Sequence, residues 1–205
     1  AAIEAALLKQ ARVCVIDSPA GGLMAYQHRE GVDYLQSERE IFNYFEALIP
    51  VLTERKKIRQ SMLEQDCDED EIHARMIQEI PYFIFLPDLV WFTQMLQMSE
   101  LQMEGALKNI IGKGAMHNVY FFGVLSVEDR SQVNGMELFQ AFSGYRTGIH
   151  FGGKVDENRV LGFDYVPFRE QAVLMKAGVG MLPDTLVDAD AAKVIVPLVR
   201  GKKND

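Results

Sequence analysis

The sequence predicts a three-layer α/β fold with a mostly parallel central sheet. Three apolar runs of strand length cover residues 12–17, 82–87 and 119–125, and helix-length segments separate them. Continuous apolar runs are typical of parallel strands, because helices cover both faces of such a sheet. We therefore expect these three runs to be neighbouring parallel strands joined by right-handed crossovers.

Helices and shorter strands complete the predicted pattern. Ser37 and Glu40 have the spacing of a capping box, at the start of a long helix over residues 37–60. Pro50 should kink or split that helix. Further helices are predicted over residues 1–10, 89–103 and 136–142, and further short strands over 149–151, 179–182 and 193–199.

Length and composition indicate a single globular domain spanning residues 1–205. The net charge of -8 argues against a protein that coats nucleic acid. No apolar run approaches about 18 residues, so we predict no transmembrane segment. Cys14 and Cys67 lack metal-site or redox spacing, which favours a reducing, cytosolic setting.

Acidic residues follow two of the predicted strands. Asp17 ends the first run and Asp88 follows the second. Ligands of open parallel sheets bind at the carboxyl ends of the strands, so both acids are candidates for a nucleotide or metal site. They can equally well cap a turn or a helix. The phosphate-binding pattern Gly-x-x-x-x-Gly-Lys is absent from the sequence, and we interpret Gly112–Gly114 as a turn.

The predicted helix after the second strand carries an apolar stripe. Trp91, Met95 and Met98 have the spacing i, i+4, i+7 and therefore share one helical face. Met and aromatic residues form adaptable surfaces for binding helices, so this stripe is a candidate protein-binding groove. Core packing is the alternative for each of the three residues.

In order and spacing, the segments resemble FtsK/SpoIIIE-family P-loop ATPase domains, most closely the C-terminal ATPase modules of type VII secretion motors, the EssC/EccC group. The run ending at Asp17 resembles the strand after the P-loop helix, and residues 83–89 resemble the Walker B strand. The other segments that carry the resemblance are residues 37–57, 119–126 and 176–183.

The resemblance implies a RecA-like P-loop NTPase fold and, as cofactors, ATP with magnesium. It implies that Asp88 is a Walker B-like catalytic residue, and that Asp17, Gly178 and Gly180 bind nucleotide. Secreted substrate proteins and neighbouring ATPase modules are the implied partners, in a hexamer of the full-length protein. The implied location is the cytoplasmic side of a membrane-anchored protein.

The sequence departs from the family pattern at the nucleotide site. No Walker A loop is present, and Pro87 stands where the magnesium-associated Asp is expected. We therefore expect that this chain alone does not hydrolyse ATP, and that it recognises substrates or regulates the motor. One alternative is an active ATPase whose P-loop lies outside these residues. Another is a DNA translocase that uses the basic run Arg55–Arg59, although such a run is also typical of a solvated helix end.

Overall fold

The chain forms two compact units. The computed structural model describes residues 2–144, 147–155, 158, 160, 161, 163, 166, 168–183 and 192–196. The larger unit comprises Ala2–Ala141, and Phe142–Asp205 belong to the smaller unit. The single domain over residues 1–205 stays a prediction. None of the helices in the described ranges is both long and apolar enough to span a membrane.

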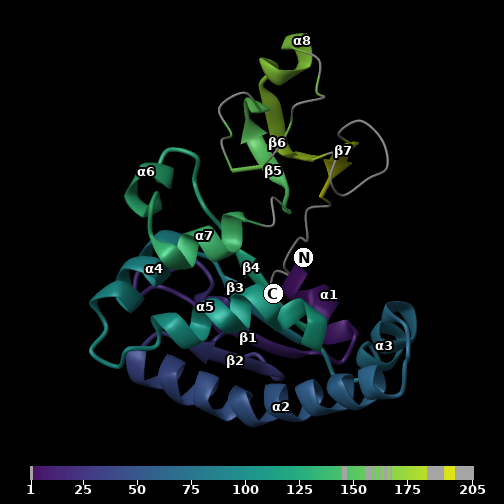
Figure 1. Ribbon diagram of the computed structural model, residues 1–205. Coiled ribbons are helices and arrows are strands. Elements are labelled where there is room, and N and C mark those ends of the chain that lie inside the picture. The colour runs from purple at the N-terminus through teal and green to yellow at the C-terminus, as the bar shows by residue number, and fades with distance from the viewer. Residues whose placement is uncertain are drawn as a thin grey trace, which may run out of the picture. The chain divides into compact units, whose positions relative to one another are not determined.

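A four-stranded parallel sheet forms the centre of the larger unit, in the order β2-β1-β3-β4 (Figure 1). Val13 pairs with Phe83, and Phe83 pairs with Tyr120. This order confirms the predicted neighbours. The strand β2 was not predicted. The strands are β1 (Arg12–Ile16), β2 (Val32–Leu35), β3 (Tyr82–Leu86) and β4 (Val119–Gly123).

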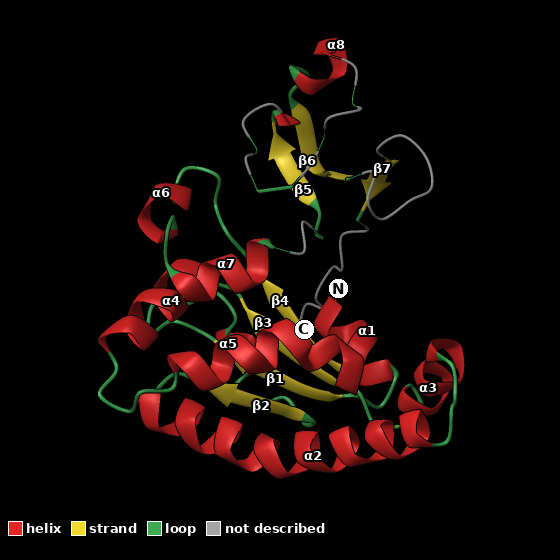
Figure 2. Ribbon diagram, viewed as in Figure 1, coloured by secondary structure: helices red, strands yellow, loops and turns green. Residues whose placement is uncertain are grey.

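Helices lie on both faces of this sheet. The helix α1 (Ala2–Leu8) buries Ile3 and Ala6 in one cluster with Val13, Val15 and Phe85. On the opposite face lie α2 (Glu38–Glu64), which runs along the sheet (Figure 2), and α4 (Leu89–Met98). The Phe45 ring of α2 stacks on Phe121 at 6.3 Å, and Leu89 of α4 lies against Gly123.

The long helix α2 begins with the predicted capping box. The Ser37 hydroxyl accepts a hydrogen bond from the Glu40 amide, and the Glu40 carboxylate accepts one from the Ser37 amide at 3.0 Å. Of the two predicted effects of Pro50, splitting of the helix does not occur, because α2 is one element, and a kink stays a prediction. Pro50 is exposed, so water can reach the carbonyl that loses its partner, while buried Phe45 and Leu48 hold the helix on the sheet.

Shorter helices complete the larger unit. Residues 104–113, which the sequence left unassigned, form α5, and the predicted turn at Gly112–Gly114 is instead the end of α5 and the start of η2. These elements are η1 (Met24–Tyr26), α3 (Glu69–Met76), α5 (Glu104–Lys113), η2 (Gly114–His117), α6 (Arg130–Val133) and α7 (Glu137–Ser143), the last of which continues into the smaller unit.

The strand β4 is only partly buried, although its sequence predicts a covered strand. Val119 is buried, whereas 44% of the Phe122 surface is exposed. Rings stack on the sheet face that carries α1, with Phe83 at 5.3 Å from Tyr120 and Phe85 at 5.0 Å from Phe122. Within the described residues β4 pairs with β3 alone, which explains the exposure.

The smaller unit contains a separate antiparallel sheet of β5 (His150–Gly153), β6 (Met175–Leu182) and β7 (Ala192–Ile195), together with α8 (Phe168–Gln171). The sequence pattern did not predict that these short strands form a sheet of their own. Val155, Phe163, Val166 and Met181 form the core of this unit. The predicted strand residues 197–199 lie outside the described residues.

Candidate functional site

Two acidic side chains lie at the carboxyl ends of neighbouring strands, as predicted. β1 and β3 pair in parallel with Val15 opposite Phe85. This register places Asp17 level with Pro87, one residue before Asp88. The carboxyl edge of the sheet therefore brings the ends of both strands together, and the two carboxylates differ in what they bind.

The Asp17 side chain is enclosed, with 1% of its surface exposed. Its Oδ2 accepts hydrogen bonds from the Leu23 amide at 2.9 Å and from the Tyr34 hydroxyl at 2.8 Å. Its Oδ1 is buried without a hydrogen-bond partner. Burial, followed by the hydrogen bond and the charge of Asp17, raises the pKa of Tyr34 to about 12. Asp17 thus ties β1 to β2 and to the loop between them.

Gly21 closes over the Asp17 carboxylate. A Cβ atom on Gly21 would lie 1.9 Å from Asp17 Oδ1, a separation that no side chain can adopt. The loop is also held by hydrogen bonds to the Ser18 carbonyl, from the Gly21 amide at 2.8 Å and from Gln36 Nε2 at 3.1 Å. In this conformation no ligand reaches Asp17.

Asp88 is the N-cap of α4. Its Oδ1 accepts a hydrogen bond from the Trp91 amide at 2.9 Å, which satisfies one of the free amides of the first helical turn. The preceding Pro87 offers no side-chain oxygen. The carboxylate predicted to be catalytic therefore has a structural partner in the first turn of α4.

These residues do not fit a magnesium–nucleotide site on their own. Such a site needs carboxylate or hydroxyl ligands for the metal and a backbone cradle for the phosphates. Asp17 is covered by Gly21, and Asp88 caps α4. In the described part of the chain no group of three His, Cys, Asp or Glu residues could hold a metal ion.

The two glycines predicted to bind nucleotide lie on β6 of the smaller unit. Gly178 has φ of +80°, and its carbonyl accepts a hydrogen bond from the Val196 amide at 2.9 Å. A Cβ on Gly180 would lie 2.8 Å from the Phe151 ring. Backbone conformation and close packing therefore explain both glycines locally. Their binding of nucleotide stays a prediction.

Trp91, Met95 and Met98 share the outward face of α4. The inward face buries Leu89, Phe92, Thr93 and Leu96. Trp91 and Met95 are half-buried, and Met98 is 78% exposed. Val124 is also exposed, and its carbonyl accepts a hydrogen bond from the Leu89 amide at the start of α4, at 3.1 Å. This outward face is accessible to a partner, and partner binding there stays a prediction.

The two arginines of the basic run on α2 are engaged by other parts of the larger unit. Arg55 is 4% exposed and donates hydrogen bonds to the carbonyls of Ile80 at 2.6 Å and His117 at 2.7 Å. Its guanidinium also lies 5.2 Å from the Tyr82 ring centre. Arg59 pairs with Glu69 at 2.7 Å. These contacts remove the two arginines from a free basic surface, whereas Lys56 and Lys57 are exposed. A DNA-binding role stays a prediction.

Sequence reasoning missed the role of Arg55, although a signal was present. Ile41, Phe45 and Leu48 mark the buried stripe of α2, and Arg55 continues it seven residues after Leu48. A cationic side chain on a buried apolar stripe is expected to donate hydrogen bonds to acceptors inside the fold. Burial accordingly lowers the pKa of Arg55.

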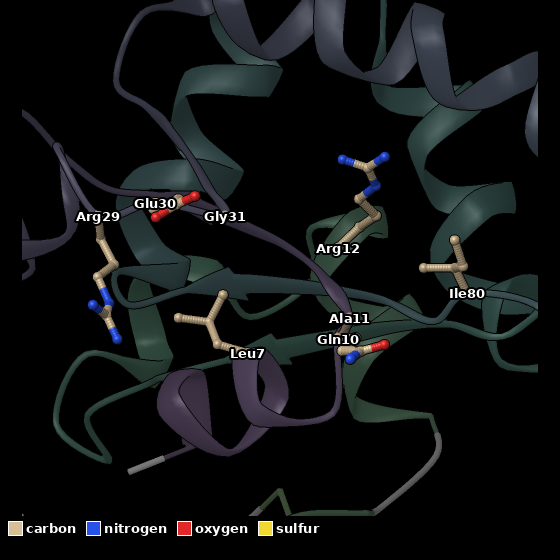
Figure 3. A pocket seen from close by; sticks show the side chains of 8 residues that line it. All are labelled: Leu7, Gln10, Ala11, Arg12, Arg29, Glu30, Gly31 and Ile80. Carbon is tan, nitrogen blue, oxygen red and sulfur yellow. The ribbon is translucent and has the colours of Figure 1, made fainter.

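An open hollow of about 430 Å³ lies at the amino ends of the strands (Figure 3). Leu7, Ala11 and Ile80 form part of its lining. Figure 3 shows Arg12 and Arg29 on opposite sides, with guanidinium groups that do not converge. Arg29 is paired with Glu4 at 3.0 Å. The hollow therefore does not present its two cations to one ligand.

The fold matches solved structures of EssC. The first is described as the cytoplasmic domain of EssC, with a TM-score of 0.72 and 15% identity, over 96% of this chain and 36% of that one. The second, EssC (ATPases 2 and 3) from Geobacillus thermodenitrificans, has a TM-score of 0.70 and 16% identity, over 96% and 33% of the two chains. The chain thus spans about a third of each. No family model and no curated protein matches the sequence. At this identity the likeness shows a shared fold.

Proposed function

We propose that this chain is a module of a type VII protein secretion motor, in which it recognises a secreted protein or regulates neighbouring ATPase modules and does not itself turn over ATP. The observation that carries the proposal is the strand end after β3 in an EssC-like fold. Pro87 has no carboxylate there, and Asp88 is engaged by the Trp91 amide. The proposal includes assembly of the full-length protein into a hexamer on the cytoplasmic side of a membrane.

The absence of turnover is tested with the purified chain and MgATP. We expect phosphate release at the background rate, because residues 1–205 lack a phosphate cradle and its lysine. Turnover that is lost in Asp88→Ala and kept in Asp70→Ala would contradict the proposal. Asp70 is a matched control, because it is an exposed acid in the first turn of α3.

The recognition role is supported by the outward face of α4. A half-buried Trp with neighbouring Met residues suits an apolar helix from a partner, and such anchors contribute about 2 kcal/mol. Trp91→Ala should therefore weaken binding of a type VII substrate protein by about 30-fold in calorimetry. Leu63→Ala, which truncates an exposed apolar residue on α2, is the control. Equal affinities of Trp91→Ala and wild type would reject this surface.

The alternative is an ATP-hydrolysing module whose P-loop lies outside residues 1–205, and the topology favours it in one respect. The connection from β2 to β3 passes over the face that carries α2, whereas α1 enters β1 on the opposite face. Suppose that the crossover from β2 to β3 and a crossover through α1 into β1 are both right-handed. A strand preceding α1 would then lie on the outer side of the edge strand β4. A longer form of the protein that hydrolyses ATP, and loses this activity in Asp88→Ala, would favour the alternative.

A further inference from the structure

The Asp17 carboxylate is incompletely satisfied in the closed loop. Oδ2 has two donors, whereas Oδ1 has neither a donor nor access to water. No ion pair to Asp17 forms within the described residues, and Tyr34 and Leu23 supply only neutral donors. A buried carboxylate oxygen without a donor is unfavourable, and hydration would relieve it.

The cover over Oδ1 is a short, exposed segment. Ser18 is buried, but Pro19, Ala20 and Gly22 are exposed, and Gly21 is half-buried. The core cluster on this side of the sheet begins again only at Leu23. Moving residues 19–22 away from Asp17 therefore exposes little apolar surface, while it brings water to Oδ1.

We propose that residues 19–22 form a flap that opens locally over Asp17 and presents its carboxylate at the carboxyl edge of the sheet. Gly21 sets the closed state, because only a residue without Cβ lets the segment reach the carboxylate. The open state lets Oδ1 accept hydrogen bonds from outside the fold. The flap does not depend on the secretion role, and its failure leaves that role standing.

A matched pair of glycine variants tests the flap. Gly21→Ala should hold the segment away from Asp17. Gly22→Ala should change little, because its Cβ meets nothing within 4 Å and its φ is not positive. The readout is labelling of carboxylates by a water-soluble carbodiimide with glycine ethyl ester, followed by mass spectrometry. Exposed Asp33 on β2 is the internal reference.

In the wild type and in Gly22→Ala, Asp17 should label about tenfold more slowly than Asp33, because reaction requires opening. In Gly21→Ala the two rates should approach each other. Slow Asp17 labelling in a folded Gly21→Ala protein would overturn the proposal, and so would equal Asp17 and Asp33 rates in the wild type.

If Gly21→Ala fails to fold, hydrogen exchange of the wild type tests whether the flap opens locally. The Leu23 amide is bound to Asp17, and Val15 lies in the centre of β1. Opening of the flap predicts that the Leu23 amide exchanges faster than that of Val15, at a rate that low urea does not change. If both amides exchange with the same urea dependence, only global unfolding exposes Asp17 and the flap is rejected.

Discussion

Each end of the parallel sheet contains a buried charged side chain, Arg55 or Asp17, for which no ion pair forms among the described residues. The hydrogen bonds that these two side chains make differ. At the amino ends, both Nη atoms of Arg55 donate to carbonyls that precede β3 and β4, while its buried Nε has no hydrogen-bond partner. At the carboxyl ends, Asp17 accepts from one amide and one hydroxyl and keeps an unpartnered oxygen. The first arrangement joins a long helix to two strands, whereas the second closes a short loop.

The difference follows from where the partners come from. The acceptors of Arg55 are main-chain carbonyls just before the paired strands β3 and β4. Asn118, which lies beside them, donates a hydrogen bond to the Glu79 carbonyl at 2.7 Å. Asp17 depends on Gly21 and Leu23 in an exposed loop. We therefore expect the contacts of Arg55, at the amino ends of the strands, to contribute to the global free energy of unfolding. We expect the contacts of Asp17, at the carboxyl ends, to affect chiefly the local opening of the flap.

The largest expected effect is at Arg55. Arg55→Met keeps much of the side-chain volume but leaves buried carbonyls without donors, so the free energy of unfolding should fall by about 3 kcal/mol. Urea denaturation measures this loss. Lys56→Met is the control, because Lys56 is the exposed neighbour on the same helix. If Arg55→Met costs less than about 1 kcal/mol, the amino end does not dominate stability.

Three of the four strands of the parallel sheet, β1, β3 and β4, could be predicted from the sequence, whereas the edge strand β2 could not. β1 and β3 are buried on both faces and therefore read as continuous apolar runs. β2 has only four residues, with exposed Asp33 among them, and so gives no such signal. β5 and β6 pair antiparallel, a property that short runs rich in glycine do not encode.

The candidate site could be predicted only in part for the same reason. The position of Asp17 at a strand end follows from the sequence pattern. Its partner Tyr34 lies on β2, so their hydrogen bond depends on a strand pairing that the sequence did not reveal. The contact between Gly21 and Asp17 depends on a loop conformation, which local propensity does not specify.

An intermediate effect is expected at Tyr34. Tyr34→Phe removes one donor from Asp17 Oδ2 while the Leu23 amide keeps the other, so we expect a loss of about 1 kcal/mol in urea denaturation at pH 8. Tyr120→Phe, whose hydroxyl has no hydrogen bond among those described, is the control. An equal loss in both variants would mean that the hydrogen bond to Asp17 contributes nothing.

The alkaline pH dependence sharpens the same test. The pKa of Tyr34 is raised from 10 to about 12 in the folded protein, so the unfolded chain loses this proton first as the pH rises. Tyr34 therefore contributes stability below pH 10 that is lost between pH 10 and about 12. The loss of stability over this range should be smaller in Tyr34→Phe than in wild type, and equal slopes would contradict the assignment.

The smallest expected effect is at His117, beside Arg55. Burial lowers the pKa of His117 from 6.5, and the nearby cations Arg59, Arg55, Lys56 and Lys113 lower it further. As the pH falls below 6.5, the unfolded chain therefore takes up this proton before the folded protein does, and stability decreases.

His117→Gln should remove that part of the acid sensitivity. We expect a difference of about 0.2 M or less in the urea midpoint at pH 5.5, because solvent screens a half-exposed ring. Added salt should shrink the difference, since it screens the four cations. A wild-type midpoint that falls no more steeply than that of His117→Gln between pH 7 and 5.5 would contradict the lowered pKa of His117.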